Sequence, residues 1–142
     1  MMVKKADYLQ RILLVFAGGF LGTITRYLLS QAIQGAWGKS WPYDIFLINI
    51  TGAFILALLS TLADATLFIG PRLRLLLNVG FLGAYTTFST LALGDITLLT
   101  NQQLIPALLY LICSLGGGLI AVLLGQLAGL WLIRLKKRPK HG

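Results

Sequence analysis

Residues 80–90 read GFLGAYTTFST and lie near the middle of 75–94, a run without Asp, Glu, Lys or Arg. Such a run is long enough to cross the hydrocarbon core of a bilayer as a helix. The two glycines and the four Ser and Thr residues of this stretch fall where polar groups are most costly. Irregular backbone is tolerated at that depth only within protein or beside a cavity. The stretch therefore predicts a helix that is broken inside the membrane, with freed carbonyl groups facing inward.

The composition of the whole chain is that of a membrane protein. Of the 142 residues, 57% are hydrophobic and 11% are charged, and the mean hydropathy is +0.83. Soluble domains carry roughly 25% charged residues. The runs 45–63 and 96–133 are also free of charge, and 12–38 contains only Arg26. We predict an all-α membrane protein in which 1–142 form one transmembrane domain, with four spans at about 12–34, 44–64, 72–97 and 104–135.

The charges of the chain are unevenly placed. With four spans, both termini and the 65–74 linker share one side of the membrane, and the loops of the other side carry only Lys39. By the positive-inside rule we predict a multi-pass protein of the cell (inner or plasma) membrane with both termini in the cytoplasm. A basic tail after an apolar helix is typical of contact with anionic lipid, so we expect membrane lipid as a partner and no nucleic acid. The terminal side carries ten basic residues: Lys4, Lys5, Arg11, Arg72, Arg74, Arg134, Lys136, Lys137, Arg138 and Lys140.

Several polar side chains lie inside the predicted spans, where such groups usually face a partner, a cavity or water. Asn49 and Gly52 are three residues apart and share one side of their helix. The Asn49 amide can donate hydrogen bonds to an anion or tie two helices together. Tyr110 and Ser114 are one turn apart and can point two hydroxyl groups into the same space. Arg26 has two interpretations, a functional group in the first span or a side chain that snorkels to the interface.

Small residues recur every four positions in the first and last spans. Gly18 and Gly22 form one such set, and Gly117, Ala121, Gly125 and Gly129 form the other. Both sets allow helix backbones to approach closely. The spacing alone is compatible with packing inside one chain and with dimerisation.

The predicted spans lack the side-chain groups that enzymatic catalysis requires. They contain no carboxylate pair, no histidine cluster and no nucleophile beside a base. The single histidine, His141, is next to last in the chain, and Cys113 is the single cysteine. Hydroxyl groups, amides and aromatic ring edges such as that of Phe88 suit an anion instead.

Residues 80–90 closely resemble the signature of the Fluc family of fluoride channels, also called CrcB proteins. Three further motifs agree with this resemblance. They are GGFLG at 18–22 followed by Arg26-Tyr27, Asn49-x-x-Gly52 followed by Phe54, and Tyr110 with Ser114. Together the matches fall in all four predicted spans.

The resemblance implies a fluoride-specific channel subunit for passive efflux, which lowers cytoplasmic fluoride and its toxicity. Family members are antiparallel, dual-topology dimers of four-helix subunits, with two pores and one structural sodium ion that is not transported. Carried over to this sequence, the backbone carbonyls of Gly83 and Thr86 would hold the sodium ion at the dimer centre, and Arg26 would lie near a vestibule. The residues implied for the fluoride pore are Asn49, Thr87, Phe88, Ser89, Tyr110 and Ser114.

Three features depart from the family pattern, one of which is a Glu that commonly follows the phenylalanines and is displaced here to Gly94-Asp95. Leu91 stands where a second Phe is usual, and Asp44-Ile45 stand where a Gly-Thr pair is usual. The charge bias favours insertion in one orientation, whereas an antiparallel homodimer needs both. The resemblance is therefore compatible with a homodimer or with a heterodimer that contains an oppositely oriented homologous subunit.

Two alternative functions remain open. One is a small four-helix antiporter, which needs a carboxylate inside the membrane, although Asp64 and Asp95 sit at span ends. The other is a pore-degenerate structural subunit of a heterodimeric fluoride channel.

Overall fold

The computed structural model describes residues 5–65 and 69–137, and every regular element in these ranges is a helix. The four long apolar segments can each cross a membrane by length and composition. The prediction of an all-α membrane protein with four spanning helices is therefore confirmed. The elements are α1 (Lys5–Trp37), α2 (Tyr43–Asp64), α3 (Pro71–Arg74), the π-helix η1 (Leu75–Leu82), α4 (Gly83–Tyr85), α5 (Phe88–Thr100) and α6 (Leu104–Lys137).

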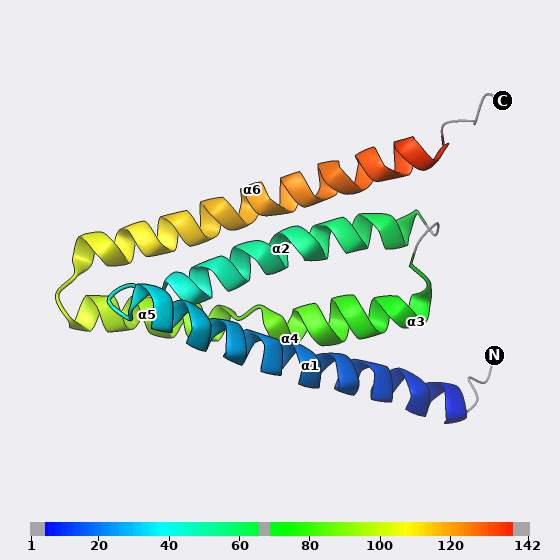
Figure 1. Cartoon of the computed structure of the whole chain (residues 1–142), viewed down its shortest axis with the longest axis horizontal. Coiled ribbons are helices and arrows are strands. Elements are labelled where there is room, and N and C mark those ends of the chain that lie inside the picture. Colours follow the sequence, from blue (N-terminus) through cyan, green and yellow to red (C-terminus); the bar gives the residue numbers. More distant parts are fainter. Residues whose placement is uncertain (1–4, 66–68, 138–142) are drawn as a thin grey trace.

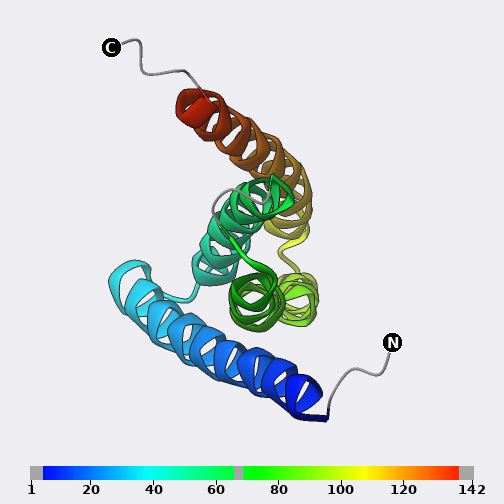
Figure 2. The same ribbon diagram turned by 90° about the vertical axis from the view of Figure 1, so that its right-hand side faces the viewer.

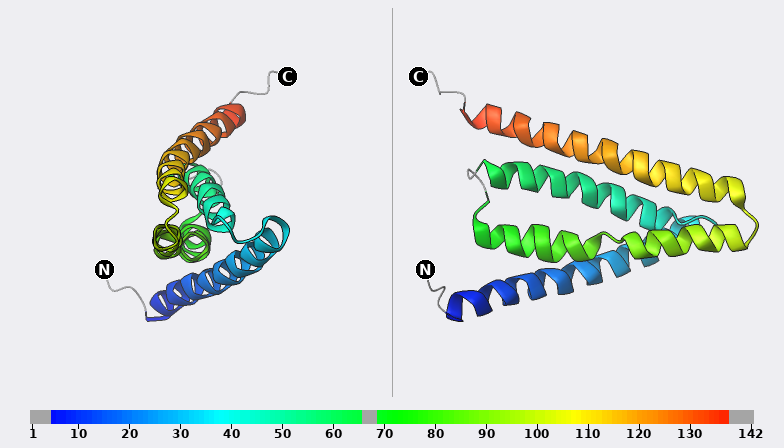
Figure 3. Two further views of the ribbon diagram at one scale, coloured as in Figure 1. Left: turned by 90° about the vertical axis from the view of Figure 1, so that its left-hand side faces the viewer. Right: turned by 180° about the vertical axis from the view of Figure 1, so that it is seen from behind.

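The spans run alternately up and down, so both chain ends and the connection after α2 lie at one end of the molecule (Figure 1). The helices do not close into a compact bundle. Viewed end-on, α1 and α6 lie on opposite sides of α2 and the third span (Figures 2 and 3). Large apolar side chains cover the exterior, among them Phe16, Leu119 and Trp131. An exterior of this kind fits a bilayer, because lipid removes the cost of exposing apolar groups to water.

The third span, Pro71–Thr100, is made of four consecutive elements. Pro71 stands in the first turn of α3, where its missing N–H has no helical partner to lose. The helix then widens into η1 before α4 ends at Tyr85. Thr86 and Thr87 have extended backbones, with ψ angles of 153° and 117°, and α5 begins again at Phe88. The two halves of this span are visible in Figure 1 on either side of a short non-helical segment.

Glycines allow α1 to pack directly against η1. A methyl group at Gly18 would overlap the carbonyl oxygen of Leu76, and one at Gly22 would overlap that of Phe81. From the other side, a methyl group at Gly80 would lie 2.7 Å from the carbonyl oxygen of Val15. The two backbones are therefore in contact, so the glycine pair of the first span serves packing inside the chain.

The small residues of the last span serve the same purpose against α2. A methyl group at Gly125 would overlap the Phe54 carbonyl oxygen, and one at Gly129 would lie 2.8 Å from Thr61 Cβ. Ala121 is also buried in this contact region. Of the two interpretations of these small-residue sets, packing within one chain is the one that the structure shows.

Some of the basic residues that make the two ends of the molecule unequal in charge lie within the described ranges. The basic residues Lys5, Arg11, Arg72, Arg74 and Arg134 lie at the end of the molecule that holds both chain ends, whereas Lys39 lies at the other end. Lys4, Arg138, Lys140 and His141 lie outside the described residues.

We expect Gly22→Ala to lower the free energy of unfolding by about 1–3 kcal/mol, because its methyl group would meet backbone that cannot move independently of the helix. Thermal unfolding in detergent measures this change. Gly35→Ala is the matched control, since Gly35 lies in the same helix with nothing within 4 Å of an added methyl group. Equal melting temperatures for the two variants would contradict the close contact of α1 and η1.

Candidate functional site

The third span is broken at Thr86 and Thr87, and one side chain of α2 stabilises this break. The Asn49 amide nitrogen donates to the Thr87 carbonyl oxygen at 3.0 Å, and the Thr87 backbone N–H donates to the Asn49 side-chain oxygen at 2.8 Å. A single amide thus satisfies the free backbone N–H of a residue that lies outside a helix, and it adds a donor to the carbonyl of the same residue. Because an unpaired backbone group inside a membrane costs several kcal/mol, this pair stabilises the break.

Thr87 also caps the helix that follows. Its hydroxyl oxygen accepts a hydrogen bond from the Thr90 backbone N–H at 3.2 Å, which satisfies one free donor of the α5 N-terminus. The same hydroxyl lies 3.2 Å from that of Ser89 and 3.0 Å from that of Thr90. Three hydroxyl groups therefore cluster at the start of α5.

α2 approaches the break closely because residue 52 is a glycine. A methyl group there would overlap the Thr86 side chain and would lie 3.0 Å from the Tyr85 ring. The Tyr85 hydroxyl in turn lies 3.0 Å from the hydroxyl of Thr51. Asn49, Thr51 and Gly52 thus place one part of α2 against the break.

Two carbonyl groups beside the break lose their usual helical donors. The N–H that would bond to the Gly83 carbonyl in a continuous helix is that of Thr87, which is directed to Asn49. The corresponding donor for Thr86 is the N–H of Thr90, which bonds to the Thr87 hydroxyl. Within the described ranges, neither carbonyl accepts a hydrogen bond from another element. Oxygen atoms of this kind can coordinate a hard cation.

Tyr110 and Ser114 are buried in α6 and face the other spans. The Tyr110 side chain is fully buried and packs with Ile45, Leu91 and Trp41. Its hydroxyl and that of Ser114 have no hydrogen-bond partner among the residues that the structure describes. Two unpaired hydroxyl groups on one helix face are unusual in a folded interior, because each represents an uncompensated desolvation cost. Leu91 lies in this core, so its alkyl group fills space beside Tyr110.

The remaining predicted site residues lie apart from these bonds. Phe88 begins α5 and is 76% exposed on the surface of the single chain. Gly83 is also exposed, whereas Thr87 is buried. Arg26 is half-buried in α1 and has no ion-pair partner within the described part of the chain. The structure therefore joins Asn49 to Thr87 and Ser89 but leaves Phe88 facing outward.

A cavity of about 420 Å³ lies at the end of the molecule opposite the chain ends. It is bordered by the end of α1, the following loop, the first turn of α2 and the middle of α5. Asp44 lines it and is buried, with its carboxylate accepting hydrogen bonds from the Ser30 hydroxyl at 2.5 Å and the Gln34 amide at 2.7 Å.

Sequence reasoning missed two polar features. Ser30 and Gln34 are four residues apart in α1, and this spacing is the signal that could have linked them to a common partner. Asn78 is an amide in a charge-free run, and it donates to the Ser60 hydroxyl at 3.0 Å inside the packed region of η1. In both cases the hydrogen-bond partner lies on another helix, so the sequence alone does not indicate the contact.

A family model described as CrcB-like protein, Camphor Resistance (CrcB), matches residues 13–126. The chain belongs to the CrcB family. The matched CrcB region includes all of α2 and the complete third span, and therefore every residue of the break.

Relatives of this CrcB chain are named fluoride-specific ion channel FluC. The protein of Chlorobium luteolum is 42% identical over 117 residues, which cover 82% of this chain and 90% of the relative. That of Chlorobaculum tepidum is 40% identical over 124 residues, covering 87% and 98%. The Synechocystis protein is 45% identical over 115 residues, covering 81% and 88%.

We expect Asn49→Ala to lower the free energy of unfolding by about 1–3 kcal/mol, because it leaves the Thr87 backbone N–H without its partner and removes one donor from the Thr87 carbonyl. Hydrogen exchange of the Thr87 amide is expected to accelerate in the variant. The matched control is Gln126→Ala, which removes an exposed amide from α6. Unchanged exchange at Thr87 would show that the amide of Asn49 does not hold the break.

Proposed function

We propose that the chain is a subunit of a fluoride-specific channel in the cell membrane, through which fluoride leaves the cytoplasm passively. The observation that carries this proposal is the break beside Asn49, because it brings polar groups to membrane depth in a chain whose relatives are named fluoride-specific ion channels. Efflux of this kind lowers cytoplasmic fluoride and its toxicity. No group in the proposed path needs to change covalently, so the protein acts as a channel and not as an enzyme.

The donors of the proposed path come from three helices. An amide nitrogen carries two hydrogens, and Asn49 uses one for the Thr87 carbonyl, so the second can donate to an anion. The hydroxyl groups of Thr87 and Ser89 lie beside it. Tyr110 and Ser114 contribute two further hydroxyl groups without a partner among the described residues. Such donors replace part of the hydration shell that fluoride loses on entry.

The path is completed in this proposal by a second, antiparallel subunit. Phe88 is exposed on the single chain, and a facing subunit would enclose its ring so that its positive edge contacts the anion. The unequal charges at the two ends favour one orientation for this chain. We therefore infer an inverted homologous subunit as partner, with a homodimer as the alternative. Both termini would then face the cytoplasm, and Arg26 would lie near a vestibule.

A structural sodium ion fits the residues beside the break. The carbonyl groups of Gly83 and Thr86 have lost their helical donors, and Gly83 is exposed on the single chain, where the same groups of a second subunit can approach. These two residues of each subunit would hold the ion at the dimer centre. The ion would neutralise the carbonyl dipoles there and so stabilise the assembly.

Fluoride efflux from liposomes, followed with a fluoride electrode, tests the proposed function. We expect efflux when the chain is reconstituted with an inverted homologous subunit, and none from the chain alone, because its charge bias favours one orientation. Efflux should not depend on a pH gradient, since a channel needs no proton coupling. Efflux from the chain alone, with chain ends accessible on both sides, would overturn the heterodimer. Efflux driven only by a pH gradient would indicate an antiporter.

We expect Phe88→Ile to abolish fluoride efflux in the active assembly, because isoleucine has no positive ring edge to contact the anion. Trp131→Ile is the aromatic control, since Trp131 is 60% exposed on α6 and lies outside the proposed path. The control is expected to retain the efflux of the unmodified protein. Full efflux by the Phe88 variant would instead favour a structural, pore-degenerate role for this chain.

A further inference from the structure

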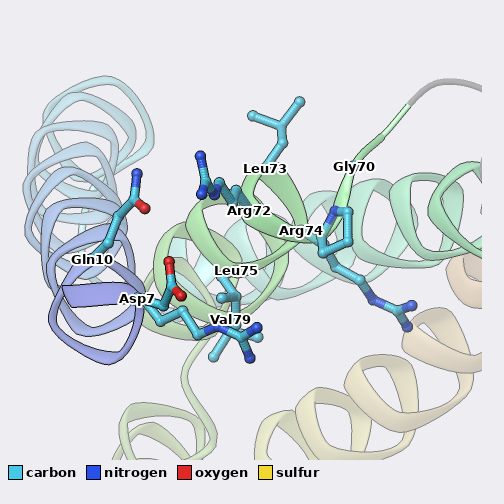
Figure 4. Close-up of a pocket in the computed structure, with 10 residues that line it drawn as sticks. Asp7, Gln10, Gly70, Arg72, Leu73, Arg74, Leu75 and Val79 are labelled. Carbon is cyan, nitrogen blue, oxygen red and sulfur yellow. The ribbon is translucent and has the colours of Figure 1, made fainter. Parts of the chain in front are cut away.

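A cavity of about 710 Å³ lies between the beginning of α1 and the beginning of the third span (Figure 4). It is at the end of the molecule where both chain ends lie, and none of its lining residues belongs to the proposed fluoride path. Asp7, Gln10 and Arg11 border it from α1. The other side is formed by 70–75 and Val79.

Two of the three arginines that line this cavity are not neutralised. Arg74 forms an ion pair with Asp64 at 2.7 Å, and Figure 4 shows its guanidinium turned away from α1. Arg11 and Arg72 have no ion-pair partner within residues 5–65 and 69–137. Asp7 is the one carboxylate in the lining, and Figure 4 shows it and the Arg72 guanidinium extending toward the space between the two helices. The cavity thus has one net positive charge.

The walls of the cavity are apolar, and a second, apolar groove on α1 shares Arg11 with it. Leu73, Leu75 and Val79 form the wall on the third span. Arg11 also borders a second hollow of about 480 Å³, which is lined by Tyr8, Ile12, Val15 and Phe16. These four residues follow α1 away from the chain end, which in a membrane is the direction of the hydrocarbon core. A small anion such as inorganic phosphate would leave this apolar groove uncovered.

We propose that this cavity binds one anionic glycerophospholipid of the phosphatidylglycerol class. The lipid phosphate accepts hydrogen bonds from the guanidinium groups of Arg11 and Arg72, whose planar donors match its oxygens. A headgroup hydroxyl donates to the Asp7 carboxylate. One acyl chain lies in the groove of Ile12, Val15 and Phe16, where it covers the exposed side chains of Ile12 and Phe16 beside the half-buried Val15.

The charge and depth of the site agree with this occupant. The single net positive charge of the cavity matches the single negative charge of phosphatidylglycerol. Arg11 lies six residues after the start of α1, or about 9 Å along the helix, so its long side chain can reach the headgroup region while its carbons contact the acyl chain. Basic pockets between membrane helices are known to bind anionic head groups.

Native mass spectrometry of the protein, purified in its own assembly, tests the proposal by counting bound phosphatidylglycerol and phosphatidylcholine. We expect the double variant Arg11→Gln/Arg72→Gln to bind phosphatidylglycerol about thirtyfold more weakly, because each substitution removes one charged contact with the lipid phosphate. The matched control is Arg134→Gln/Lys136→Gln, which removes two positive charges from the same end of the molecule but outside the cavity. The control should bind the lipid as tightly as the unmodified protein.

Three results would overturn the proposal. They are equal loss of lipid in both double variants, equal binding of phosphatidylcholine and phosphatidylglycerol, and displacement of the lipid by inorganic phosphate. A second measurement needs no variant and therefore does not depend on its folding. A phosphatidylglycerol analogue with a photoreactive acyl chain should label 12–16 of the unmodified protein, and labelling confined to α6 would exclude the site. These measurements do not rely on fluoride transport.

Discussion

The structure depends on one constraint, that a helix interrupted inside a membrane must find a partner for every polar backbone group that the interruption frees. Asn49 meets this constraint for Thr87 by donating to its carbonyl and accepting from its N–H. The same arrangement deprives Gly83 of its helical donor, and the Thr87 cap deprives Thr86 of its own. Stabilising the break and exposing two carbonyl groups are therefore consequences of the same few hydrogen bonds.

Close helix packing brings the partner side chains within reach. Gly52 lets α2 approach the break, and Gly22 with Gly18 lets α1 contact the widened turn of η1. A side chain at Gly52 would force α2 away from the break and draw Asn49 away from Thr87, and side chains at Gly18 and Gly22 would separate α1 from η1. Small residues in this chain are thus used mainly for internal contacts, which leaves the exposed surface of α5, including Phe88, available to another subunit.

The two ends of the molecule differ in their electrostatic character. One end has a cavity with a buried carboxylate, Asp44, held by two neutral side chains of α1. The other has a cavity bordered by Arg11 and Arg72 beside an apolar groove. By the positive-inside rule such a difference favours one orientation in a bilayer, and the basic end carries the proposed site for anionic lipid. In an antiparallel assembly, each side of the membrane would therefore carry one end of each kind.

The four spans and the family could be predicted from the sequence, and the non-helical residues Thr86 and Thr87 lie within the stretch 80–90 that the sequence analysis singled out. These follow from local properties, because hydropathy over about 20 residues decides membrane insertion and the hydroxyl-rich stretch 80–90 lies within a single span. Helix packing was needed to show that Asn49 pairs with the Thr87 backbone, that both small-residue sets pack inside the chain, and that Arg11 and Arg72 border one cavity. Each of these facts joins residues from different helices, and the relative position of two helices depends on side-chain packing that no single segment encodes.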